Sequence, residues 1–61
     1  MEIRKYLLTR NKETIAAILR VCEKFPCFIN AEAASATQFW LSVKLRVEDV
    51  AGADRILRPY I

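Results

Sequence analysis

Residues 38–47 alternate between two sets of side chains without interruption. One set is Phe39, Leu41, Val43, Leu45 and Val47, and the other is Gln38, Trp40, Ser42, Lys44 and Arg46. A period of two residues is typical of a β-strand with one buried face and one face available to solvent or a partner. We therefore expect a strand over 38–47, and its available face is where function should be sought.

The chain has 61 residues, which corresponds to a single small domain over 1–61. A domain of this size removes only about 60% of its unfolded surface from water, so a lone monomer is marginally stable. Because 54% of the residues are apolar, the composition favours a packed body over disorder. Together these properties predict a homo-oligomer, most simply a dimer.

The segment from Glu2 to Thr9 is predicted to be a first strand. Ile3, Lys5 and Leu7 are expected on its buried side, with Arg4, Tyr6 and Leu8 on the other. Asn11 is the expected cap of a helix that follows. The apolar residues at helical spacing are Ile15, Ile18, Leu19, Cys22 and Phe25, and Pro26 ends the helix.

Residues 27–33 alternate again and predict a second strand, from Cys27 to Ala33. The short turn over 34–37 would join it to the strand over 38–47 as an antiparallel hairpin, although this turn has no Gly or Asn.

A second helix is predicted from Glu48 onward. Its apolar residues are Val50, Ala53, Leu57 and Tyr60, its first turn is acidic, its last turn is basic, and Pro59 closes it. Gly52 costs this helix about 1 kcal/mol relative to Ala, which indicates either tight packing at that position or a marginal helix.

The order strand, helix, strand, strand, helix predicts an α+β fold. It corresponds to a truncated ferredoxin-like βαββα unit, an antiparallel sheet with two helices on one face. In this topology the first strand pairs with the third and its other side is an unpaired edge, which a second copy of the chain often covers.

A mostly helical fold is the alternative. Met1 to Phe25 can be drawn as one long helix, and Asn30 can cap another, which would make the central segment a possible helix-turn-helix DNA reader. This alternative leaves the alternation and the β-branched and aromatic content of residues 39–47 unexplained.

The chain contains no histidine and a single glycine, which argues against proton-shuttle catalysis and a glycine-rich phosphate loop. We expect no enzyme activity and no cofactor. Cys22 and Cys27 cannot complete a zinc site within one chain. They are interpreted as two small buried apolar residues, with an intrachain disulfide or redox pair, or an intersubunit metal site, as alternatives.

The predicted binding residues share one sheet face. Tyr6, Phe28 and Trp40 would project from it, one per strand, accompanied by Arg4, Lys44 and Arg46. These residues could anchor a subunit interface or a protein partner. They could also bind single-stranded RNA or DNA, by stacking on bases and pairing with phosphates. A third interpretation is that Tyr6 or Phe28 faces the helices.

Residues 18–57 resemble the ACT and RAM domains, which are small regulatory modules of amino-acid metabolism. The resemblance lies in a helix ending at Lys24-Phe25-Pro26, the strands 28–31 and 40–47, and the acidic start Glu48-Asp49-Val50 of the next helix. It implies an oligomeric regulatory role, with small effectors bound between subunits.

No membrane partner is expected, because the longest uncharged run, residues 33–43, is too short to span a bilayer. With no secretory leader recognised, a cytoplasmic location is expected. The sequence therefore predicts a non-catalytic, self-associating regulatory or assembly module, with single-stranded nucleic-acid binding as the alternative.

Overall fold

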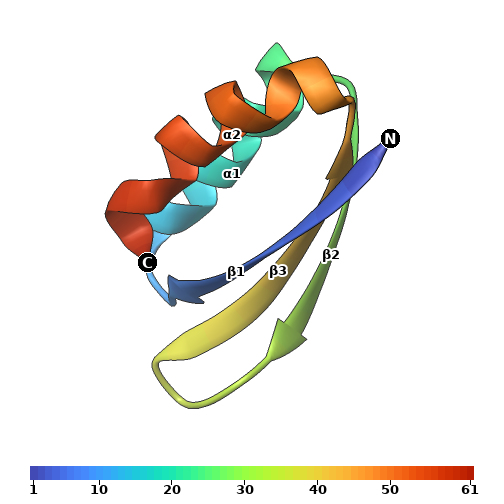
Figure 1. Ribbon diagram of the computed structural model, residues 1–61. Coiled ribbons are helices and arrows are strands. Elements are labelled where there is room, and N and C mark those ends of the chain that lie inside the picture. Colours follow the sequence, from blue (N-terminus) through green and yellow to red (C-terminus); the bar gives the residue numbers. More distant parts are fainter.

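A computed structural model describes all 61 residues as three strands and two helices (Figure 1). The elements are β1 (Glu2–Thr9), α1 (Lys12–Lys24), β2 (Cys27–Ala33), β3 (Gln38–Leu45) and α2 (Val50–Leu57). Short 3-10 turns span Val47–Asp49 and Arg58–Tyr60. The predicted α+β, ferredoxin-like βαββα order is confirmed, and the mostly helical alternative is wrong.

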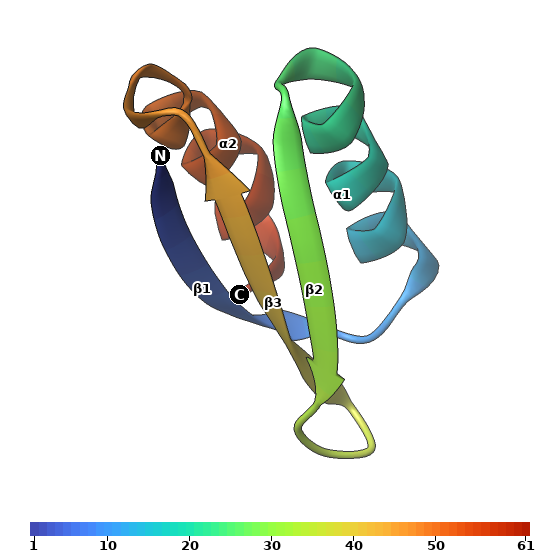
Figure 2. The same ribbon diagram turned by 90° about the vertical axis from the view of Figure 1, so that its right-hand side faces the viewer.

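The sheet is antiparallel, in the order β1-β3-β2, and both helices lie on one of its faces (Figures 1 and 2). β3 is central, as the predicted ferredoxin-like topology requires. Leu41 of β3 lies opposite Tyr6 of β1 on one side and opposite Ala31 of β2 on the other. Opposite residues share a face, so Leu41 and its partners all point toward the helices.

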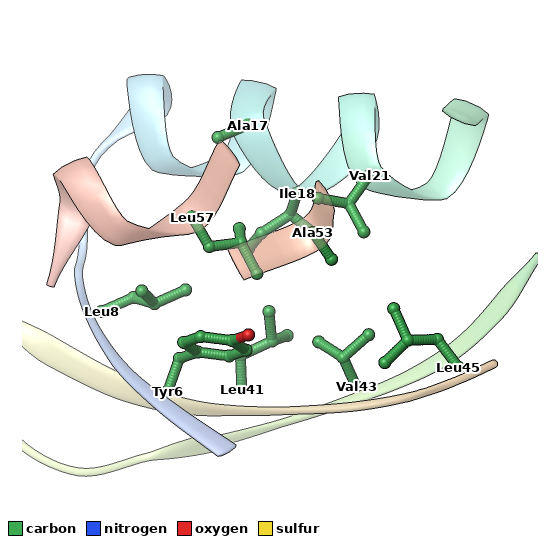
Figure 3. Packing of buried hydrophobic residues seen from close by; sticks show 10 residues of the cluster. All are labelled: Tyr6, Leu8, Ala17, Ile18, Val21, Leu41, Val43, Leu45, Ala53 and Leu57. Atoms are coloured by element: carbon green, nitrogen blue, oxygen red, sulfur yellow. The ribbon is translucent and has the colours of Figure 1, made fainter. Parts of the chain in front are cut away.

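The core fills the space between the sheet and the two helices (Figure 3). It consists of Tyr6, Leu8, Ala17, Ile18, Val21, Leu41, Val43, Leu45, Ala53 and Leu57. Ala17 of α1 and Ala53 of α2 are both fully buried, and such small side chains allow the two helices to approach closely. The core is small, since only 12 of 61 residues are buried.

The predicted faces of β1 are reversed. Tyr6 is only 7% exposed and Leu8 is fully buried, whereas Ile3 and Lys5 lie on the face away from the helices. Burying the opposite set would desolvate the ammonium group of Lys5, which is costly without a partner. The structure therefore places the amphipathic Tyr6 in the core and leaves the cation in solvent.

Helix α1 starts where the sequence predicts. The Asn11 side chain accepts hydrogen bonds from both the backbone N–H and the hydroxyl of Thr14, each at 2.9 Å. The helix buries Thr14, Ala17, Ile18 and Val21. Of the predicted apolar face, Ile18 is buried and Phe25 is half-buried, while Ile15, Leu19 and Cys22 are exposed.

The turn between β2 and β3 forms without Gly or Asn because Ser35 caps it. The Ser35 hydroxyl accepts from the backbone N–H groups of Thr37 and Gln38, at 3.3 and 3.1 Å. Side-chain capping of this kind replaces the backbone freedom that glycine would supply.

The strand over 38–47 ends two residues earlier than predicted, at Leu45. Arg46 and Val47 belong to the turn that leads into α2, and Val47 is exposed instead of buried. Within α2, a Cβ atom on Gly52 would lie 2.6 Å from the ring carbon Cζ of Phe25. Tight packing therefore accounts for the glycine.

Candidate interaction surfaces

The face of the sheet opposite the helices is uncovered, and we call it the open sheet face. By the strand register it carries Ile3, Lys5 and Leu7 from β1, Trp40, Ser42 and Lys44 from β3, and Phe28, Asn30 and Glu32 from β2. Phe28 is 70% exposed and Trp40 is 44% exposed. Since one face of an antiparallel sheet is commonly solvated, this mixed polar and aromatic surface is compatible with solvent as well as with a ligand.

Three of the six predicted binding residues lie on the open sheet face, namely Phe28, Trp40 and Lys44. Phe28 is directly opposite Lys44 on the neighbouring strand, so an exposed ring and a cation are adjacent there. The structure confirms this part of the predicted arrangement. That these three residues contact a partner or ligand stays a prediction.

The other three residues are elsewhere, and their predicted placement is wrong. Tyr6 is in the core and Arg4 shares its side of β1, where its guanidinium lies 2.9 Å from Glu2. Arg46 follows the end of β3, and its Nε donates to Asp49 at 2.8 Å. This contact with the Asp49 carboxylate raises the pKa of Arg46.

Ile3, Lys5 and Leu7 occupy the β1 part of the open sheet face in place of Arg4 and Tyr6. The sequence pattern does not indicate this placement, because the same alternating set predicts the buried side of β1. The charge of Lys5 was the one signal that could have corrected the assignment, since an unpaired ammonium is rarely buried.

A second uncovered surface lies on the helix side of β2. No residue of this strand is buried, although β3 pairs with it along its whole length. A mostly apolar groove runs beside it, which we call the β2 groove. It is lined by Ile15, Ile18, Ile29, Ala31, Ala33, Phe39 and Leu41, together with the charged residues Arg10 and Glu32. Ile29 is 45% exposed although it points toward the helix layer.

Two strand edges are unpaired, β1 on one side of the sheet and β2 on the other (Figure 2). They differ in protection. β1 carries Glu2, Arg4 and Lys5, and charged residues on an edge strand oppose pairing with another chain. Its inward side chains Tyr6 and Leu8 are also covered by the helices.

The β2 edge has no such protection. Glu32 is the single charged residue of this strand, and none of its side chains is buried beneath a helix. Long, apolar edge strands with exposed backbone groups favour pairing with a further strand. Of the two edges, β2 is therefore the better candidate for an interface.

In comparisons with known proteins, no family model, curated protein or solved structure matches the chain. The resemblance to ACT and RAM domains therefore stays a prediction. Neither helix has the length and apolar character needed to cross a membrane. No group of three or more potential metal-ligating side chains gathers in the structure.

Proposed function

We propose that this chain is a non-catalytic module that self-associates by pairing its β2 strand with β2 of a second copy, and serves as a regulatory or assembly unit. The observation that carries the proposal is the exposure of β2 from Phe28 to Ala33 beside an apolar groove. Pairing would cover both the unpaired backbone groups and the groove.

The backbone geometry of the edge selects a register for this pairing. The N–H of Ala34 donates to the carbonyl of Gln38, and ladder bonds recur at every second residue. The even-numbered residues of β2 therefore bond to β3. The odd-numbered residues direct their N–H and C=O groups to the free edge, and these are Cys27, Ile29, Ala31 and Ala33.

If the two copies are related by a two-fold axis through Asn30, the midpoint of β2, all of these N–H and C=O groups form hydrogen bonds between the chains. Ile29 then lies opposite Ala31 of the second copy, and Cys27 lies opposite Ala33. An antiparallel ladder with these pairs makes about eight hydrogen bonds between the chains. Any other two-fold register shortens the ladder.

The side chains are compatible with the same register. On the helix side all opposing residues are apolar, and on the open sheet face Glu32 lies opposite Phe28 of the second copy. Within that second copy, Phe28 is paired with Lys44 on the adjacent strand β3. Each Glu32 carboxylate therefore faces a phenylalanine ring with a lysine on its far side. Like charges do not meet, which is a requirement for a stable cross-strand pair.

Sedimentation equilibrium tests the proposal with a matched pair of variants. Ile29→Lys places a charge at the proposed interface, and Ile3→Lys places the same charge on the open sheet face, where the isoleucine is 58% exposed. We expect a dimer for the wild type and for Ile3→Lys. Ile29→Lys should weaken the dimer by at least about 2 kcal/mol, or roughly 30-fold in Kd.

Two results would contradict the proposal. A wild-type chain that stays monomeric at high concentration would remove self-association itself. A dimer that dissociates with Ile3→Lys or Trp40→Ala but tolerates Ile29→Lys would place the contact on the open sheet face instead.

Binding of single-stranded RNA or DNA is the second candidate function. The observation in its favour is the adjacency of exposed Phe28 and Trp40 to Lys44 and Lys5 on the open sheet face. Aromatic stacking contributes about 1–3 kcal/mol per base, and phosphate contacts make the affinity depend on salt. Titration of Trp40 fluorescence with oligonucleotides at low ionic strength tests it, and an unchanged signal would rule it out.

A further inference from the structure

The only two thiols of the chain lie together at the junction of α1 and β2. Phe25 leaves the helix in an extended conformation (φ −129°, ψ 139°), and Pro26 follows, so the chain turns back alongside the last turn of α1. This turn places the Sγ atom of Cys27 at 3.9 Å from Sγ of Cys22, to which it donates a weak hydrogen bond.

Cys22 is exposed and Cys27 is half-buried, so the interpretation of both as buried apolar residues is wrong for Cys22. Burial raises the pKa of the Cys27 thiol, and the contact with Cys22 raises it further. Cys22 is therefore the more accessible thiol and reacts first with a reagent from solvent, and Cys27 is the less accessible thiol beside it.

We infer that Cys22 and Cys27 form a dithiol–disulfide pair that exchanges with small disulfides of the glutathione type. The sulfur atoms need to approach from 3.9 Å to a bonding distance of about 2.05 Å. The segment between them, residues 23–26, includes no buried residue, and Phe25 is its one side chain that packs against the core.

The exchange proceeds in two displacements. The Cys22 thiolate attacks one sulfur of the disulfide RSSR, which forms a mixed disulfide and releases RS⁻. Cys27 then loses its proton to solvent, attacks Sγ of Cys22 and expels the second RS⁻. Each RS⁻ takes up a proton, so two protein thiols and one RSSR become one intrachain disulfide and two RSH.

The test is mass spectrometry of the chain equilibrated with oxidised and reduced glutathione, then quenched with acid and alkylated. We expect the wild type to lose two hydrogen atoms and to block alkylation at both cysteines. Cys27→Ser should instead accumulate the glutathione adduct on Cys22, at a level at least about tenfold above the wild type, because the intramolecular attack is gone.

A relocated thiol provides the matched control. The double variant Cys22→Ser, Glu23→Cys keeps two thiols but turns one of them about 100° around the helix. It should accumulate mixed disulfides like Cys27→Ser. The Ile29→Lys variant should form the same intrachain disulfide as the wild type, since this inference does not depend on self-association.

Stable glutathione adducts on wild-type Cys22, at the level of Cys27→Ser, would overturn the inference. So would disulfides formed mainly between chains, or an intrachain disulfide that forms equally well in the relocated variant.

Discussion

The phenol of Tyr6 lies in the core beneath the helices (Figure 3), and this position has a measurable consequence at alkaline pH. Burial raises the pKa of Tyr6 above its usual value, and the carboxylate of Asp54 raises it further. The folded state therefore favours the neutral phenol. The stability that Tyr6 contributes is present below about pH 10 and is lost as the pH rises toward the folded pKa.

We predict that the free energy of unfolding falls more steeply above about pH 10 in the wild type than in Tyr6→Phe. Urea unfolding at pH 9 and 11, on the scale of the unperturbed phenol pKa of about 10, measures this difference. Parallel curves for wild type and Tyr6→Phe would contradict the account of Tyr6.

Asn11 is the second residue with a well-defined contribution. Its side chain satisfies an N–H at the start of α1 and also the hydroxyl of Thr14, which is fully buried. Asn11→Ala should lower the free energy of unfolding by about 1–3 kcal/mol, because a cap is lost and a buried hydroxyl loses its partner. Asn11→Asp, which keeps the acceptor, should lose much less in the same chemical denaturation experiment.

At the scale of elements, the packing of α2 on the end of α1 depends on Gly52. A methyl group there would overlap the Phe25 ring, so Gly52→Ala gains about 1 kcal/mol of helix propensity but must displace the ring. We predict a net loss of stability for Gly52→Ala.

The loss should reverse to a gain when Phe25→Leu is also present, because the shorter side chain leaves room for the methyl group. A double-mutant cycle by thermal or urea unfolding measures the coupling. Independent, additive effects of the two substitutions would contradict the packing account.

The elements themselves could be predicted from the sequence because each has a strong local signal. The period of two in residues 38–47, the Asn11 cap and the position of Pro26 place the corresponding element ends to within two residues. The faces of β1 could not be predicted, since Ile3 and Leu7 form one apolar set and Tyr6 and Leu8 form another. The choice depends on the register with β3 and on the cost of burying Lys5, which are not local properties.

The buried face of α1 was missed for a related reason. Thr14 and Ala17 are weak hydrophobic signals, yet they are fully buried where α1 approaches α2, while the larger Ile15 and Leu19 are left outside. The reversed faces of β1 also explain why Arg4 and Tyr6 were wrongly placed among the binding residues. Phe28, Trp40 and Lys44 were placed correctly because their strands alternate without ambiguity.

At the scale of the whole molecule, the two sides of the sheet are not equivalent. The core covers β1 and β3 with both helices, whereas β2 contributes no buried residue and borders the β2 groove. A chain with so small a core gains stability from any contact that covers this strand. The uncovered β2 edge is thus the feature on which the proposed self-association depends.

Cross-linking at the proposed two-fold axis tests this claim most directly. In a Cys22→Ser, Cys27→Ser background, Asn30→Cys would place two thiols opposite each other in a non-hydrogen-bonded pair, with Cα atoms about 4.5 Å apart. Phe28→Cys is the control, because its opposite residue is Glu32 and the two introduced thiols would be roughly 13 Å apart. The account predicts rapid formation of a covalent dimer by Asn30→Cys under mild oxidation and little by Phe28→Cys. Equal or slower cross-linking of Asn30→Cys would contradict it.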